Sequence, residues 1–184
     1  MSQELLAILK DKAYERKLVT LASGKQSNFY IDVKRVSLMA KGSVLIGRGL
    51  FQIIRKEFPS AVAAGGLTLG ADPLATAVSY TSELEGHPIE SFIVRKEAKG
   101  HGFRRMIEGG HFLPAKACVV ILEDVVTSGG SSLEAYRKIR EHGWEVLGIA
   151  AVVDREEGGR EAIEKEGLKL YSLFRKRDFE TLAA

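Results

Sequence analysis

The sequence has little of what marks secreted or membrane proteins. Its 184 residues contain one cysteine, Cys118, so no internal disulfide can form, and a lone thiol is typical of a reducing cytoplasm. Cys118 stands in an apolar run, where we expect a buried structural thiol. No apolar run approaches the roughly 18 residues of a membrane span, and the first residues lack the basic and apolar segments of a signal peptide. We therefore expect a cytoplasmic protein without a membrane partner.

Neither sign of charge dominates. The 27 lysines and arginines nearly balance the 24 acidic residues, leaving a net charge of +3, too small to imply a nucleic-acid partner. No Cys/His cluster has zinc spacing. The chain also lacks a nucleotide P-loop, a dinucleotide-binding G-x-G-x-x-G and a hydrolase G-x-S-x-G. We expect His87, His111 and His142 to face solvent.

Apolar segments of strand length alternate with segments of helical periodicity. The alternation predicts an α/β fold whose mostly parallel sheet is flanked by helices, and the length suits a single domain over 1–184. We expect helices over 2–17, 41–58, 72–84 (capped by Asp72), 131–142 and 160–166. We expect strands over 18–23, 29–33, 61–64, 89–94, 117–122, 144–153 and 168–173. The stretches 95–110 and 123–130 are expected to be loops, and residues 175–177 a solvated end.

The most informative segment follows the apolar run 117–122. Glu123 and Asp124 stand at the end of this run, and small residues follow in 127–131, where a helix is expected to begin. Small residues let backbone N–H groups surround an anion, and a helix N-terminus adds partial positive charge, so 127–131 suits a phosphate. The acidic pair suits hydroxyl groups or Mg²⁺. The segment predicts a ribose 5-phosphate site; the alternative is an acidic strand end followed by a capping turn.

The stretch 95–105 is basic and glycine-rich. It carries five lysines and arginines together with His101, and such a loop would neutralise a departing pyrophosphate and exclude water. The alternatives are a solvated loop or a weak nucleic-acid patch, although the aromatic residues needed for base stacking are missing.

Two more segments follow expected strands. Arg155 comes directly after 144–153, and an arginine there suits a substrate carboxylate; the alternative is a surface turn with salt bridges. The glycine-rich turn 65–72 offers N–H groups to a second phosphate, and the alternative is tight packing.

Taken together, these segments resemble the type I phosphoribosyltransferases. The hallmark of that family is an apolar strand, two acids and a Thr/Ser/Gly loop, which 122–131 matches closely. Three further stretches, 23–32, 95–102 and 152–155, are similar to the orotate phosphoribosyltransferase branch. The matching segments span nearly the whole chain, which departs from some members at Ala22 and Gly70, where those carry lysine.

The resemblance implies a Mg²⁺-dependent glycosyltransferase (pentosyltransferase) of pyrimidine (UMP) biosynthesis. Such an enzyme transfers the phosphoribosyl group of 5-phosphoribosyl 1-pyrophosphate (PRPP) to orotate, giving orotidine 5′-monophosphate and pyrophosphate. It also implies a small hood formed by 1–35 at the base and a homodimer that shares the loop 95–105 between subunits. The alternatives are a phosphoribosyltransferase for another base and a non-catalytic regulator that senses PRPP.

Residue by residue, the resemblance implies a division of roles. Glu123 and Asp124 would hold the ribose hydroxyls, with Mg²⁺ bound mainly through substrate and with Asp124 as its candidate protein ligand. Lys99, His101 and Asp124 are the expected catalytic residues, and Lys99 is expected to affect rate more than binding. The expected PRPP contacts also include Arg95, Lys96, Val125, Val126, Thr127, Ser128, Gly129, Gly130 and Ser131. The expected orotate contacts are Lys25, Phe29, Tyr30, Thr127 and Arg155.

Overall fold

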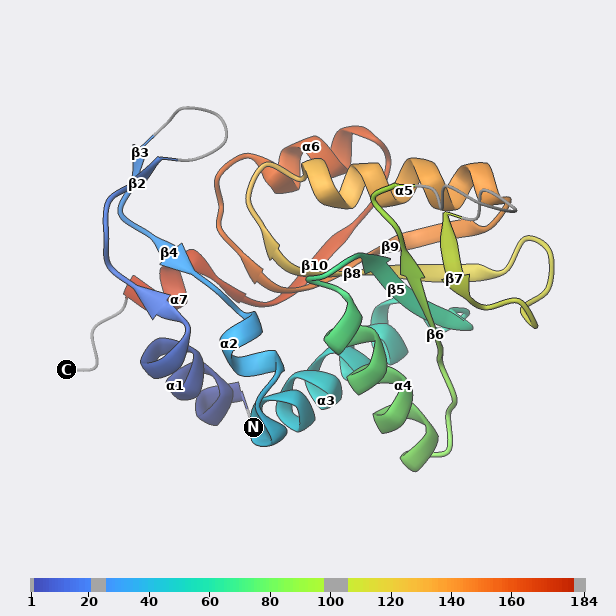
Figure 1. Ribbon diagram of the computed structural model, residues 1–184, viewed down its shortest axis with the longest axis horizontal. Helices are drawn as coiled ribbons and strands as arrows, with labels where there is room; N and C mark the ends of the chain where they lie inside the picture. The colour runs from blue at the N-terminus through green and yellow to red at the C-terminus, as the bar shows by residue number, and fades with distance from the viewer. Residues whose placement is uncertain (1, 21–25, 98–105, 181–184) are drawn as a thin grey trace.

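The protein is built on a six-stranded sheet (Figure 1). The structure is a computed structural model that describes residues 2–20, 26–97 and 106–180. Within these residues the strand order is β10-β9-β8-β5-β6-β7. The strands are β5 (Ala63–Leu67), β6 (Glu90–Val94), β7 (Ile107–Gly109), β8 (Cys118–Val126), β9 (Glu145–Asp154) and β10 (Leu170–Arg175). All neighbours are parallel except β6 and β7, so the expected mostly parallel sheet is confirmed.

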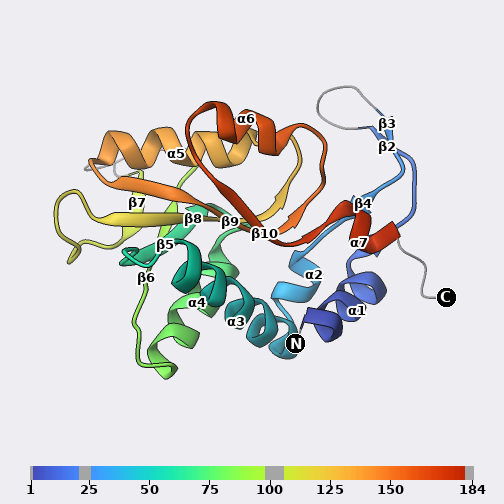
Figure 2. The same ribbon diagram turned by 180° about the vertical axis from the view of Figure 1, so that it is seen from behind.

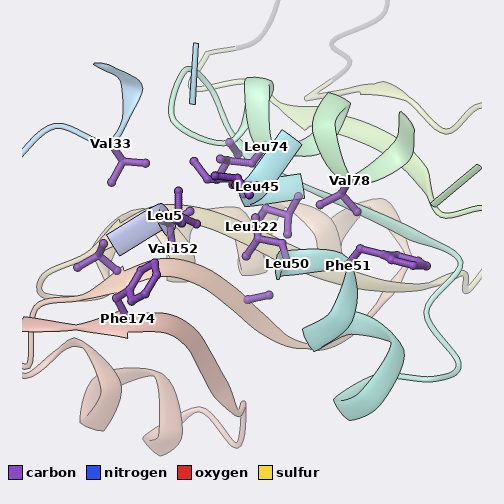
Figure 3. Close-up of a cluster of buried hydrophobic side chains, with 14 of the residues drawn as sticks. Leu5, Val33, Leu45, Leu50, Phe51, Leu74, Val78, Leu122, Val152 and Phe174 are labelled. Atoms are coloured by element: carbon purple, nitrogen blue, oxygen red, sulfur yellow. The ribbon is translucent and has the colours of Figure 1, made fainter. Parts of the chain in front are cut away.

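Helices cover both faces of the sheet, as the two opposite views show (Figures 1 and 2). One face carries α3 (Ala40–Glu57) and α4 (Asp72–Leu84), and the other carries α5 (Gly130–His142) and α6 (Gly159–Lys165). Successive residues of β8 point to opposite faces of the sheet, and both faces are covered, which explains its continuous apolar run. Val120 and Leu122 face the core beneath α3 and α4 (Figure 3), whereas Val119 and Ile121 face the core beneath α5 and α6. A strand buried on both faces needs apolar residues at every position.

Two small antiparallel pairs of strands stand apart from the main sheet, both formed by the N-terminal segment. That segment holds α1 (Ser2–Lys12), β1 (Tyr14–Glu15), β2 (Val19–Thr20), β3 (Gln26–Ser27), β4 (Tyr30–Ile31) and α2 (Lys34–Ser37). The last helix, α7 (Lys176–Glu180), packs against it. The ring of Phe179 lies 5.7 Å from that of Tyr14 and 5.5 Å from that of Phe29, centroid to centroid. The two ends of the chain therefore share one aromatic cluster.

Several expected boundaries are wrong in the N-terminal part. The first helix ends at Lys12 rather than at residue 17, because β1 leaves it to pair with β4. The described parts of 18–23 and 29–33 contain strands of only two residues. Residues 175–177 lie at the junction of β10 and α7, and Arg175 and Arg177 are exposed there, as expected of a solvated segment.

Other errors lie close to the carboxyl ends of the main strands. The stretch 123–130 was expected to be a loop, yet β8 continues to Val126 because Val125 and Val126 pair with β9. Residues 107–109 form β7 rather than loop. The N-cap of α4 is Ala71, and Asp72 instead accepts a hydrogen bond of 2.8 Å from the Thr68 hydroxyl.

The single thiol and three histidines had expected degrees of burial that the structure tests. Cys118 is only partly buried, so the expected buried thiol is wrong, because the residue stands at the very start of β8. His87, His111 and His142 are exposed, as predicted. Among the described helices, none has both the length and the apolar character that crossing a bilayer requires.

Candidate functional site

The carboxyl ends of β5, β8 and β9 bring the sequence motifs together at one edge of the sheet, where ligands bind in open parallel α/β folds. A Cβ atom at Gly70, in the turn after β5, would lie 2.8 Å from the Asp124 carboxyl carbon of β8. A Cβ atom at Gly159 would lie 2.6 Å from the carbonyl oxygen of Thr127. The turns after the three strands are thus in direct contact.

The loop between β8 and α5 has the features of an anion site. Gly129 occupies the N-cap position with φ 80°, a left-handed conformation that favours glycine, and no side chain within the described residues caps α5. The first N–H groups of the helix therefore remain available to an anion. The hydroxyl of Ser131 donates to Glu123 at 2.6 Å, so its backbone N–H is the donor that Ser131 would offer to an anion.

The two adjacent carboxylates have different surroundings because successive residues of a strand point to opposite faces. Glu123 is buried, and its Oε2 accepts hydrogen bonds from Ser131 at 2.6 Å and Ser132 at 2.9 Å. Burial, reinforced by the charge of Asp124, raises the pKa of Glu123 to about 7, while the two serine hydroxyls oppose the rise. Asp124 accepts from the N–H of Val125 at 2.8 Å and lies on the side of the Gly70 turn.

A Glu123→Gln variant is expected to alter how stability depends on pH. The folded-state pKa of Glu123 lies above its ordinary value of 4.5, so the native state binds this proton more tightly than the unfolded chain does. The wild-type free energy of unfolding should therefore fall by up to roughly 3 kcal/mol as pH rises from 4.5 to 7, a loss that glutamine abolishes. Urea unfolding at about pH 5 and pH 8 measures it, and parallel pH profiles for the two proteins would contradict it.

Arg155 is buried rather than placed in an open surface turn, yet it forms a salt bridge with Glu157, as the alternative expected. Its Nη2 donates to the Phe29 carbonyl at 2.7 Å, to Ser27 Oγ at 3.1 Å and to Glu157 Oε1 at 3.1 Å. Its Nε and Glu157 Oε2 are both buried without a hydrogen-bond partner among the described residues. The guanidinium thus ties the N-terminal segment to the end of β9 while retaining an unused donor.

The other residues expected to contact the base differ in how deeply they are buried. Phe29 is buried in the aromatic cluster beneath Arg155, whose guanidinium carbon lies 5.5 Å from the centre of its ring. Tyr30 is half-buried, with the Lys17 ammonium 4.1 Å from the centre of its ring. Lys25 lies outside the described residues.

The basic loop is anchored at its first residues by a lysine that the sequence did not single out. Lys138 of α5 donates to the carbonyl oxygens of Arg95 at 2.9 Å and Lys96 at 2.8 Å. The Arg95 side chain pairs with Glu108 of β7 at 3.3 Å. Lys99 and His101 lie outside the described residues. No local pattern marks this contact, because the two carbonyl groups stand about 40 positions away from Lys138 in the chain.

The glycines of the turn 65–72 serve two different purposes. A Cβ atom at Gly65 would lie 1.9 Å from the Phe92 carbonyl oxygen, and one at Gly66 would lie 2.3 Å from that of Leu122. Tight packing between strands therefore explains these two glycines. Gly70 instead faces Asp124, so this part of the turn belongs to the site.

Comparisons with known proteins give a consistent result, although no family model matches the chain. The orotate phosphoribosyltransferase of Aquifex aeolicus is 49% identical over 89% of this chain and 87% of its own. That of Thermosynechococcus vestitus is 48% identical over 98% of this chain and 93% of its own. The crystal structure of Mycobacterium tuberculosis H37Rv orotate phosphoribosyltransferase in complex with 5-phospho-α-D-ribosyl 1-diphosphate is 37% identical, covers 97% of this chain and 98% of its own, and has a TM-score of 0.79.

Proposed function

Because the chain belongs to the orotate phosphoribosyltransferase family, we propose that it transfers the phosphoribosyl group of PRPP to orotate, giving orotidine 5′-monophosphate and pyrophosphate. The observation that carries the proposal is the end of β8, where an acidic pair meets an uncapped helix N-terminus across a loop of small residues. In a ribose 5-phosphate, the phosphate suits the uncapped helix N-terminus and the two hydroxyl groups suit the acidic end of the strand. The similarity over nearly the full length of curated orotate enzymes favours orotate over other bases.

In this proposal the chain mainly positions its substrates. The N–H groups of 127–131 bind the 5-phosphate, with Val125 and Val126 beside it. Asp124 orients the ribose hydroxyls, whereas Glu123, expected to share that role, is buried and accepts from Ser131 and Ser132. The bond from the anomeric carbon to pyrophosphate breaks ahead of bond formation to the orotate ring nitrogen, so positive charge develops on the ribose. Arg95, Lys96, Lys99 and His101 neutralise the departing pyrophosphate.

The residues present fit a Mg²⁺ ion held mainly by substrate. The described residues contain no group of three or more candidate metal ligands, so they offer no all-protein cage. Asp124 lies beside the turn after β5, and Asp72, next to that turn, has a buried Oδ1 without a hydrogen-bond partner among the described residues. One carboxylate together with substrate phosphates is a common way to hold Mg²⁺. When bound, the ion would offset negative charge on the pyrophosphate.

We also propose that the chain forms a hood over the base, assembles as a homodimer and is located in the cytoplasm. Residues 1–35 would form the hood over the base, because Ser27 and Phe29 accept hydrogen bonds from Arg155 at the end of β9. The loop 95–105 would reach the active site of the second subunit of a homodimer, as the resemblance implies. The single thiol supports a cytoplasmic location.

The test is the loss of orotate absorbance after enzyme is added to orotate, PRPP and Mg²⁺, with adenine, hypoxanthine and uracil as parallel substrates. We expect rapid consumption of orotate alone, and we expect a chelator to reduce it at least about 100-fold and excess Mg²⁺ to restore it. Consumption of a purine instead would indicate a phosphoribosyltransferase for another base. No turnover with any base would favour the PRPP-sensing regulator.

A further inference from the structure

The Asp124 carboxylate is enclosed on three sides. Its Oδ1 accepts the N–H of Val125 at 2.8 Å. The backbone at Gly70 lies so close that an added Cβ atom would be 2.8 Å from both Oδ1 and the carboxyl carbon. Its Oδ2 lies 3.6 Å from the ammonium group of Lys34. The backbone therefore fixes one carboxylate oxygen, and Lys34 is the cation that faces the other.

Lys34 is itself held in place rather than extended into solvent. Its ammonium group lies 2.9 Å from Asp32 Oδ1, and its backbone N–H donates to the same oxygen at 3.2 Å. The ammonium group is thus held between Asp32 and Asp124 from the first turn of α2.

A solvated surface pair is the simpler explanation, but the two side chains argue against it. The side chain of Asp124 is only 14% exposed, whereas that of Lys34 is 44% exposed. A carboxylate withdrawn this far from water, next to the buried Glu123, takes its orientation from the few groups that touch it, and an opposite charge at 3.6 Å is one of them. Lys34 is the cation of the described residues that forms an ion pair with it.

We infer that Lys34 is a positioning residue for the transfer reaction: from the N-terminal segment it holds the Asp124 carboxylate in the orientation that receives the ribose hydroxyls of PRPP. The inference rests on the proposed function and adds a residue to it. It also joins the two substrate sites, because the segment that carries Lys34 also carries Ser27 and Phe29, the partners of Arg155. Loss of Lys34 should therefore weaken the use of PRPP and leave orotate affinity intact.

The test compares Lys34→Ala with Arg35→Ala in steady-state kinetics with each substrate varied. Arg35 is a matched control, since it is the next residue of α2 and carries the same charge, and it pairs with Glu15 at 2.6 Å and only distantly, at 3.9 Å, with Asp32. For Lys34→Ala we expect kcat/KM for PRPP to fall about tenfold or more while the KM for orotate stays within about twofold. Lys34→Arg should recover most of the loss, because a cation is restored, and Arg35→Ala should remain near wild type.

Three results would overturn the inference. The first is a kcat/KM for PRPP within about twofold of wild type in Lys34→Ala. The second is an equal loss in Arg35→Ala, which would indicate general charge attraction. The third is an equal rise in the KM for orotate, which would indicate a displaced N-terminal segment. If the wild type uses a different base, the proposed function fails, yet the same comparison with that base still tests Lys34, because only PRPP is concerned.

Discussion

An Arg155→Ala variant is expected to lose both stability and its use of orotate. The substitution removes the arginine that Glu157 contacts at 3.1 Å and leaves Lys176, at 3.6 Å, as its neighbouring cation. Breaking a buried ion pair costs about 3–5 kcal/mol in the free energy of unfolding when no other cation remains, so we expect a loss below that range. The Phe29 carbonyl and Ser27 hydroxyl also lose a donor, which loosens the contact between the N-terminal segment and β9.

The kinetic effect should fall on one substrate. If Arg155 binds the orotate carboxylate, its removal should lower kcat/KM for orotate about 100- to 1,000-fold, with a much smaller change in the KM for PRPP. Arg160→Ala is the matched control, because Arg160 also follows β9 but pairs with the buried Asp154 at 2.9 Å. That control should lose stability and retain its orotate KM. An Arg155→Ala enzyme with a wild-type orotate KM would remove Arg155 from the base site.

A Lys99→Ala variant is expected to lower kcat about 100- to 1,000-fold, the usual effect of removing one group that stabilises developing charge. The charge in question is that of the pyrophosphate as it leaves, so the KM values for both substrates should change little. The beginning of the loop is held by Lys138 through two backbone carbonyls, so a side-chain change at position 99 leaves this anchor in place.

Single-turnover and steady-state kinetics measure the effect, with Lys165→Ala, an exposed lysine at the end of α6, as the control. An unchanged kcat in Lys99→Ala would refute the assignment. A raised KM for PRPP with an unchanged kcat would instead make Lys99 a residue of ground-state binding.

The sequence predicted the parallel sheet well because its strands carry the strongest local signal. Residues 117–122 and 144–153 are continuous apolar runs, typical of strands buried on both faces, and both lie in central strands of the sheet. The same reasoning placed Glu123 and Asp124 in a loop, because acidic residues are depleted in strands. Pairing with β9 overrides that preference, and the strand's alternation then gives the two carboxylates different partners, the serines of α5 for Glu123 and the Val125 N–H for Asp124.

The rest of the site depends on contacts between residues far apart in the chain. Lys34 meets Asp124, and Arg155 meets Ser27 and Phe29, without any local pattern that marks these partners. The short α7 has a charged sequence, and it forms because Phe179 packs against Tyr14 and Phe29. Such pairings come from the packed fold, so periodicity and motif spacing could not predict them.

The shared aromatic cluster sets an order of events during synthesis on the ribosome. Tyr14 and Phe29 are synthesised before the main sheet, but their partner Phe179 follows β10, the last strand of that sheet. Contacts over such long sequence separations form late, after shorter-range structure has assembled. The main sheet can therefore assemble while the N-terminal strands still lack their packing surface. A chain truncated before α7 would keep every strand of the main sheet but would leave the aromatic side of its N-terminal segment bare, available to chaperones or to aggregation.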